Sequence, residues 1–187
     1  MNYLIENPKC VFIHIPKTGG TSIRNIRNIR NSNTKVIARE VTIPSEWDEY
    51  FKFAFVRNPY DRAISAWHAF GGLKNRPFLG FLEIATNDMI PYKNAKILEE
   101  NIRYHTISQL HPANFLKHAN FIGRFENYQD DFNKICYQLK IPHIHLLHLN
   151  KTDHKHYSEY YDDQTLEIVR NYYENELKEF GYKFEKS

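Results

Sequence analysis

The stretch CVFIHIPKTGGTS, residues 10–22, joins a nearly continuous apolar run to a lysine, two glycines and three hydroxyl side chains. The apolar run predicts a buried parallel strand. The residues that follow, 21–30, predict a helix with an isoleucine at every third position on one side. A strand, a glycine turn and a helix in this order can bind an anion, because glycines let backbone N–H groups approach a phosphate and the helix adds its positive end. We therefore expect residues 17–22 to bind a phosphate-bearing ligand.

This loop differs from the Walker A pattern of ATP- and GTP-binding proteins. In Walker A the lysine follows the last glycine and the next hydroxyl holds magnesium, whereas Lys17 precedes Gly19 and Gly20. The most apolar predicted strand, residues 51–56, is followed by Arg57 and not by a magnesium-binding aspartate. A site without a metal must neutralise its ligand with protein cations, and Arg57 is placed to do so. A glycine turn with an exposed lysine is the alternative.

The rest of the chain alternates short apolar runs with amphipathic segments. Further strands are expected at 34–38, 51–56 and 120–123, and helices at 44–50, 59–70, 77–104 (in two pieces), 128–139 and 163–180. This alternation predicts one α/β domain over residues 1–187, with a mainly parallel central sheet covered by helices. Ligands of such sheets bind beyond the carboxyl ends of the strands. Residues 16–22 and 57–65 both fall at that edge.

A second anion site is expected in RNPYDRAIS, residues 57–65. Arg57 leaves the end of a strand, and Ser65 lies two turns into the next helix. The two side chains can therefore clamp a second phosphate of the same ligand. A solvated helix start is the alternative reading.

Composition limits the classes of function. The 187 residues carry 25 basic and 22 acidic side chains, and a net charge of +3 does not indicate binding to bulk nucleic acid. No window approaches the roughly 20 apolar residues of a membrane span, and the first ten residues do not resemble a signal peptide. We expect a cytoplasmic protein, with Cys10 and Cys136 as buried free thiols.

Three stretches together resemble the carbohydrate sulfotransferases of the heparan and chondroitin type, including small bacterial relatives: HIPKTGGTS (14–22), FVRNPYDRAISAW (55–67) and FIGRFENYQDDF (121–132). The tail from residue 149, LNKTDHKHYSEYYDDQTLEIV to FGY, is similar to that family's C-terminal segment. The resemblance spans most of the chain, and the first two motifs in this order are its most specific part. It implies a P-loop-like three-layer fold.

The resemblance implies a donor substrate, 3′-phosphoadenosine 5′-phosphosulfate (PAPS), a carbohydrate or glycoconjugate acceptor, and no metal. It maps the 5′-phosphosulfate onto Lys17, Thr18, Gly19, Gly20, Thr21 and Ser22. It maps the 3′-phosphate onto Arg57 and Ser65. Arg124 follows a strand at the same edge, and Lys151 and Lys155 lie in a late loop of the kind that closes over the nucleotide in related enzymes. These three are further candidates for donor contacts. For Arg124 the first reading is structural, because Glu126 can hold Arg124 or Arg62 in place.

The resemblance also implies a catalytic base, a histidine or glutamate between the two donor motifs, while Lys17 stabilises the leaving phosphate. The segment VIAREVTIPSEW, residues 36–47, contains no histidine. Glu40 is nearest the expected place, with an exposed ion pair as its alternative role. The other candidates are His14, which is also expected to orient the loop, His68, one turn beyond Ser65, and His105 and His111.

Two other functions stay open: a nucleotide kinase-like phosphoryl transferase, and a non-catalytic module that binds the nucleotide. Five of the ten histidines fall in residues 142–156. We expect a strand and a basic loop there rather than a zinc site, because no cysteine accompanies them. The sequence predicts neither the acceptor's identity nor the oligomeric state.

Overall fold

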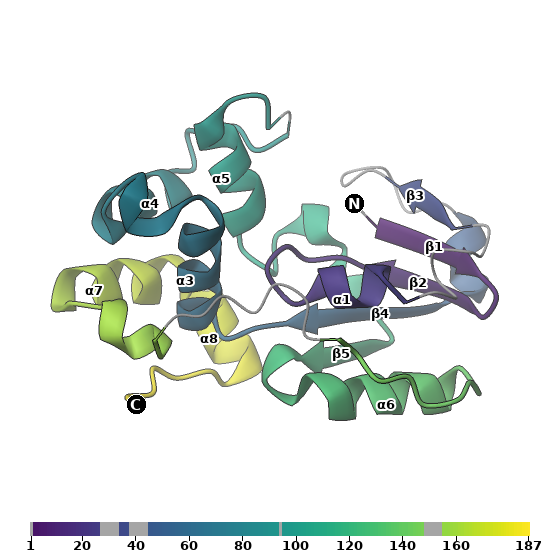
Figure 1. Cartoon of the computed structure of the whole chain (residues 1–187). Coiled ribbons are helices and arrows are strands. Elements are labelled where there is room, and N and C mark those ends of the chain that lie inside the picture. Colours follow the sequence, from purple (N-terminus) through teal and green to yellow (C-terminus); the bar gives the residue numbers. More distant parts are fainter. Residues whose placement is uncertain (1, 27–33, 38–44, 94, 148–154) are drawn as a thin grey trace. The chain divides into compact units, whose positions relative to one another are not determined.

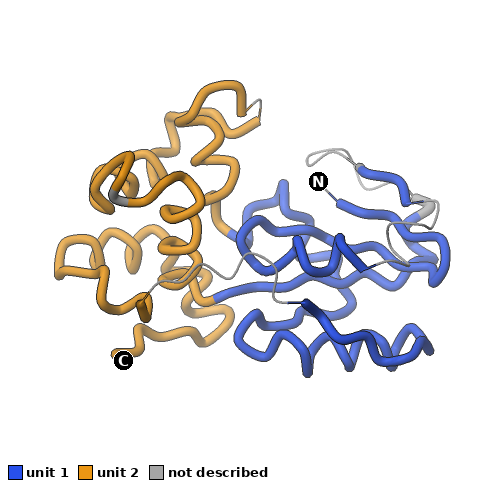
Figure 2. The backbone as a smooth tube through the Cα atoms, viewed as in Figure 1, with its two compact units in different colours: residues 1–57, 109–151 blue, residues 58–108, 152–187 orange. Residues whose placement is uncertain are grey.

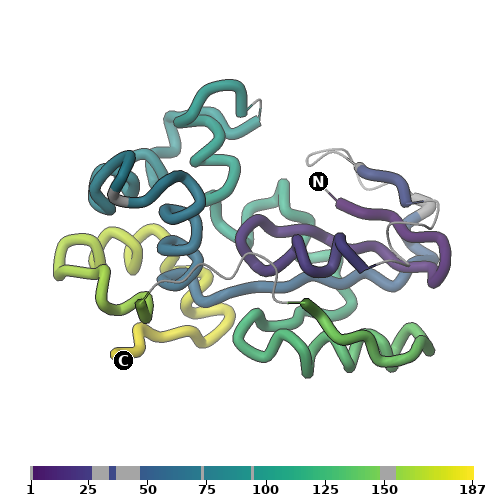
Figure 3. Tube along the Cα trace, in the orientation of Figure 1, coloured from purple at the N-terminus to yellow at the C-terminus, as the bar shows by residue number. Residues whose placement is uncertain are grey.

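The computed structural model, shown in Figure 1, describes residues 2–26, 34–37, 45–93, 95–147 and 155–187. The chain divides into two compact units, coloured in Figure 2. The sheet unit comprises residues 1–57 and 109–151, and the helical unit comprises residues 58–108 and 152–187. Each unit is built from two segments that are distant in sequence, as the colours of Figure 3 make visible. The single domain expected over residues 1–187 stays a prediction.

In the described residues all strands belong to the sheet unit: β1 (Asn2–Glu6), β2 (Lys9–Ile13), β3 (Lys35–Ile37), β4 (Phe51–Val56) and β5 (Phe121–Arg124). They form one sheet in the order β3-β1-β2-β4-β5. β2 pairs with β4 and β4 with β5 in parallel, but β1 pairs antiparallel with both β2 and β3. The expectation of a mainly parallel sheet is therefore wrong, because the sheet is mixed. Only Asn7 and Pro8 join β1 to β2, and a two-residue connection permits only antiparallel neighbours.

Alternation along the strands gives the sheet its core. Phe12 of β2 and the pair Phe53 and Phe55 of β4 point to one face, where the described part of α1 (Gly20–Arg24) and α6 (Tyr128–Gln138) cover them. Ile23 of α1 and Phe132 of α6 belong to the same buried cluster. Short 3-10 turns complete the described part of this unit: η1 (Ser45–Glu49), η3 (Pro112–Asn114), η4 (Leu116–His118) and η5 (Phe125–Asn127).

The helical unit contains α3 (Pro59–Ala69), η2 (Gly72–Lys74), α4 (Phe78–Ala85), α5 (Leu98–Thr106), η6 (Tyr157–Tyr160), α7 (Asp163–Tyr172) and α8 (Glu174–Phe180). Pro59 begins α3, and the Asn58 side chain caps it by accepting from the Tyr60 N–H. The helix expected over 163–180 is divided at Tyr173, and Gly181, at a φ of 66°, ends its second half. No strand occurs in residues 142–147, where one was expected; the rest of that segment, up to residue 154, lies outside the described residues.

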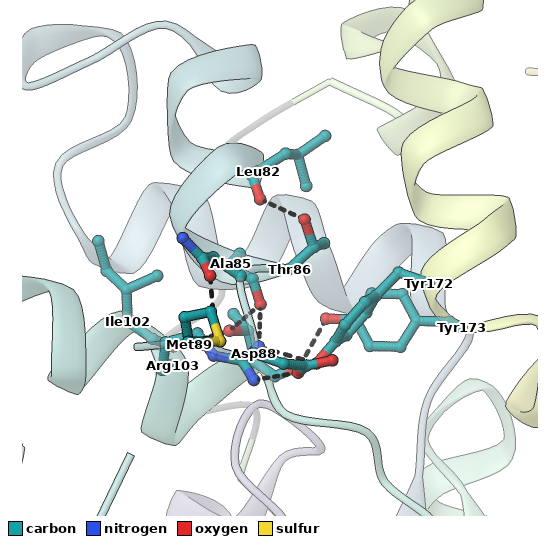
Figure 4. Close-up of polar contacts among 11 residues, drawn as sticks. Leu82, Ala85, Thr86, Asp88, Met89, Ile102, Arg103, Tyr172 and Tyr173 are labelled. Carbon is teal, nitrogen blue, oxygen red and sulfur yellow. Dashed lines mark hydrogen bonds and ion pairs between the residues drawn. The ribbon is translucent and has the colours of Figure 1, made fainter. Parts of the chain in front are cut away.

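A buried arginine joins three helices of the helical unit (Figure 4). The side chain of Arg103 on α5 is 3% exposed and donates to the Ala85 carbonyl at the end of α4. It also donates to the Tyr172 hydroxyl of α7 at 2.8 Å and to the Asp88 carboxylate at 2.6 Å. A basic group at the carboxyl end of α4 satisfies a carbonyl that the helix itself leaves without a partner.

The described helices include none that is long and apolar enough to cross a membrane.

Candidate functional site

The carboxyl ends of three neighbouring strands meet at one edge of the sheet unit. β2, β4 and β5 run parallel to one another, so the segments that follow them lie on the same side. The glycine loop follows β2, Arg57 follows β4, and Arg124 ends β5. The structure thus brings the glycine loop and Arg57 to one edge, as the sequence predicts.

The glycine loop turns through two residues in the left-handed region. Lys17 has a φ of 70° and Gly19 a φ of 87°. The Gly19 carbonyl accepts from the Ser22 N–H at 3.0 Å, which begins α1. Thr18 is fully buried, and its hydroxyl donates to the Ile15 carbonyl at 2.9 Å. The Thr18 hydroxyl proton is therefore used inside the loop.

His14 lies against the second glycine. Its backbone N–H donates to the Asn2 side chain at 3.2 Å, and its ring centroid is 5.5 Å from that of Phe12. A Cβ atom on Gly20 would lie 2.2 Å from Cδ2 of the His14 ring, closer than any real contact. A side chain at position 20 would therefore collide with this ring, and the expected role of His14 in orienting the loop stays a prediction.

Arg57 is bound on two sides and is only 8% exposed. Its Nη1 donates to the Lys17 carbonyl at 3.2 Å, and its guanidinium lies 4.2 Å from the ring centroid of Phe125. Its backbone is fixed by Gln109, which accepts from the Arg57 N–H at 3.0 Å and donates to the Arg57 carbonyl at 2.9 Å. A positive charge is thereby held directly against the glycine loop.

Tyr128 belongs to the same cluster, although the sequence reasoning did not single it out. Its hydroxyl donates to the Gly19 carbonyl at 2.6 Å, and a Cβ atom on Gly19 would lie 2.8 Å from its Cζ. Burial raises the pKa of Tyr128, and a hydrogen bond from the Ser22 side chain opposes that shift only in part. One signal was present in the sequence, since Tyr128 begins a helix just after a strand that ends at this edge.

The remaining candidates in the sheet unit have defined partners. The backbone N–H of Arg124 donates to the Asp131 carboxylate at 2.7 Å, which fixes the end of β5. The Thr21 hydroxyl accepts from Arg24 at 3.2 Å, so its own proton remains for another acceptor. His111 caps η3 by accepting from the Ala113 N–H at 3.1 Å.

Four candidates lie in the helical unit. Ser65 is half-buried on α3. The His68 ring packs between Trp67 and Tyr160, at centroid distances of 5.0 and 5.3 Å. Nδ1 of His105 lies 2.9 Å from the Asn101 carbonyl, and Lys155 pairs with Glu159 at 3.1 Å. The joining of these residues to the glycine loop stays a prediction. Glu40 and Lys151 lie outside the described residues.

Within the described ranges, no three histidine, cysteine or acidic side chains gather in an arrangement that could hold a metal ion. Cys10 and Cys136 are both buried free thiols, as expected.

The sheet unit is thus a mixed sheet with a glycine loop and a buried arginine at one edge. Comparison with known families is more specific: a model of the sulfotransferase family matches residues 3–183. Because the match covers nearly the whole chain, the chain belongs to the sulfotransferase family, whose activity is sulfuryl transfer. No match to the chain was found among curated proteins or among solved structures.

Proposed function

We propose that the protein transfers a sulfuryl group from PAPS to a hydroxyl group of a carbohydrate or glycoconjugate. The observation that carries this proposal is the hydrogen bond from the Arg57 guanidinium to the Lys17 carbonyl. It joins two segments that can each bind an anion, and PAPS carries one anionic group on either side of its ribose. A P-loop-like arrangement around a single bound nucleotide is part of the same proposal.

The donor would be held from both ends. Lys17, the backbone N–H groups of residues 18–21 and the Thr21 and Ser22 side chains would bind the 5′-phosphosulfate. Arg57 and Ser65 would bind the 3′-phosphate, with Arg124, Lys151 and Lys155 as further contacts. Arg57 suits this role because its guanidinium lies directly at the glycine loop and a planar guanidinium matches the geometry of a phosphate.

The reaction would be an in-line displacement at sulfur. The acceptor oxygen forms a bond to sulfur, the bond between sulfur and the bridging phosphate oxygen breaks, and the bisphosphate leaves with that electron pair. Lys17 would stabilise the charge that gathers on the departing phosphate. A base takes the acceptor's proton, and Glu40 is the first candidate, with His14 and His68 after it. The close packing of His14 on Gly20 favours a positioning role for that histidine.

Two other functions would use the same loop. A nucleotide kinase-like enzyme would bind ATP with magnesium, and a non-catalytic module would bind the bisphosphate without transfer. The kinase-like enzyme would transfer a phosphoryl group and the module would transfer nothing, so a transfer assay distinguishes both from a sulfotransferase.

The direct test uses PAPS labelled with ³⁵S and a panel of neutral, amino and uronic acid oligosaccharides. We expect label on at least one saccharide, and a loss of about a hundredfold or more in the rate for Lys17→Ala, as when a group that stabilises transition-state charge is removed. The control is Lys117→Ala, which removes an exposed lysine of the same unit. Phosphate transfer from labelled ATP in place of sulfuryl transfer would support the kinase-like alternative. Bisphosphate binding without any transfer would support the module.

A further inference from the structure

Three side chains of the sheet unit, Arg57, Phe125 and Tyr128, contact one another in series, and two of them bind carbonyl groups of the glycine loop. Phe125 lies under the Arg57 guanidinium, and Arg57 donates to the Lys17 carbonyl. Two residues further along the loop, the Gly19 carbonyl accepts from Tyr128, whose ring centroid is 5.5 Å from that of Phe125. The segment that follows β5 thus supplies both Phe125, which contacts Arg57, and Tyr128, which contacts Gly19.

The hydrogen bond from Tyr128 to the Gly19 carbonyl also fixes the direction of the Gly20 N–H. The Gly19 carbonyl and the Gly20 N–H belong to one planar peptide, which is trans. In a trans peptide the C=O and N–H bonds point in opposite directions. When Tyr128 and the Ser22 N–H hold the Gly19 carbonyl on one side, the Gly20 N–H must face the other.

Glycine would otherwise leave this peptide free to turn. Gly19 lacks a side chain, so its backbone rotates more freely than that of any other residue. Tyr128 opposes that rotation in two ways: its hydroxyl holds the carbonyl, and its ring occupies the space next to the Gly19 Cα. The ring is itself fixed by Phe55, at a centroid distance of 4.9 Å in an edge-on arrangement. A tyrosine hydroxyl keeps its proton throughout the neutral range, and burial raises the pKa of Tyr128 further.

We propose that Tyr128 is a positioning residue that orients the Gly19–Gly20 peptide so that the Gly20 N–H binds the 5′-phosphate group of the donor. This inference rests on the proposed function, since it assigns a partner to one amide of the proposed donor site. It assigns Tyr128 to the 5′ end of the nucleotide and not to the 3′ end, which is the basis of the test.

The test compares three nucleotides on Tyr128→Phe, a change that removes the hydroxyl and keeps the ring. We expect adenosine 5′-phosphate and 3′-phosphoadenosine 5′-phosphate to bind about three- to tenfold more weakly, the value of one hydrogen bond. Adenosine 3′-phosphate should bind with unchanged affinity. Tyr137→Phe is the matched control, because Tyr137 lies on the same helix and is 77% exposed.

The outcomes separate the two proposals. If wild-type protein binds none of the three nucleotides, the proposed function fails and this inference fails with it. If wild type binds the bisphosphate and Tyr128→Phe binds all three nucleotides as wild type does, only the role of Tyr128 is overturned. An equal loss for all three would also overturn it, because a general structural defect does not distinguish the two ends of a nucleotide.

A second measurement does not require the variant to fold. In wild-type protein labelled with ¹⁵N, adenosine 5′-phosphate should shift the amide resonance of Gly20, and adenosine 3′-phosphate should leave it in place. A Gly20 amide that does not respond to the 5′-phosphate would overturn the proposal.

Discussion

The Nη1 atom of Arg57 lies 3.2 Å from the carbonyl oxygen of Lys17, and this hydrogen bond connects the end of β4 to the loop after β2. Lys17 is held at a φ of 70°, a conformation that costs a non-glycine residue on the order of 1 kcal/mol. The buried guanidinium therefore helps to keep a strained lysine in place, in addition to any contact that it makes with a ligand.

Arg57→Lys should weaken binding of 3′-phosphoadenosine 5′-phosphate by about tenfold or more, although the charge is kept. A lysine ammonium has three donors on one atom and cannot lie flat on Phe125, donate to Lys17 and reach a phosphate at once. Calorimetric titration measures the loss, and Arg170→Lys on the exposed side of α7 is the control. Equal affinity in wild type and Arg57→Lys would mean that the planar guanidinium has no special role.

Gly20→Ala should destabilise the protein by about 1–3 kcal/mol, the usual cost of overpacking. The new Cβ would meet the His14 ring at 2.2 Å, so one of the two must move. His14→Ala removes the ring, and Gly20→Ala should then cost much less in that background. Urea unfolding of the four proteins measures this coupling. Additive effects in the double variant would show that the ring does not restrict residue 20.

Arg103→Met should lower the free energy of unfolding by about 2–3 kcal/mol, because the Ala85 carbonyl, Asp88 and Tyr172 each lose a hydrogen-bond donor. Arg103→Lys should recover only part of this loss, since lysine lacks the two-pronged geometry. Chemical denaturation gives the comparison, with Arg170→Met as an exposed control that should change stability by less than about 0.5 kcal/mol. A change that small for Arg103→Met would mean that the hydrogen bonds of Arg103 in Figure 4 contribute little to stability.

Stability should fall as the pH rises above 9, in part through Cys10. Burial raises the pKa of the Cys10 thiol from 9.0 to about 12. Between these two values the unfolded chain loses this proton and the folded chain keeps it, so the stabilisation present below pH 9 is lost as the pH rises to about 12.

The measurement is urea unfolding between pH 9 and 10, where Cys10→Val should flatten the slope by up to about 1.4 kcal/mol per pH unit. Tyr137→Phe, which changes an exposed phenol, is the control. Slopes that match wild type in Cys10→Val would contradict the raised pKa of the Cys10 thiol.

Patterns within single elements were sufficient for much of the sheet unit. The apolar run at 51–56 predicted β4 with its observed bounds, and the one at 120–123 predicted β5 to within a residue. The direction of pairing needed longer-range information. The sequence reasoning missed β1 because this strand is only five residues long, Asn2–Glu6. Asn7 and Pro8, which lie between two apolar runs, are nevertheless a signal for a hairpin.

Part of the candidate site could also be predicted from patterns within single elements. Lys17, the glycines and Arg57 each follow a strand, so parallel pairing alone brings them to one edge. Tyr128 could not be assigned from spacing, because its role depends on how α6 packs against a loop 109 residues away in the sequence. Thr18 was expected to offer a hydroxyl, and the burial that turns its hydroxyl to Ile15 is a property of the folded loop.

The central claim, a metal-free site for a nucleotide with two phosphates, is tested most directly by calorimetric titration with 3′-phosphoadenosine 5′-phosphate. ATP with magnesium is titrated into the same protein for comparison. We expect tight binding of the bisphosphate that is lost in Lys17→Ala and in Arg57→Ala and unchanged in Lys117→Ala. No binding of the bisphosphate, or a preference for ATP with magnesium, would contradict it.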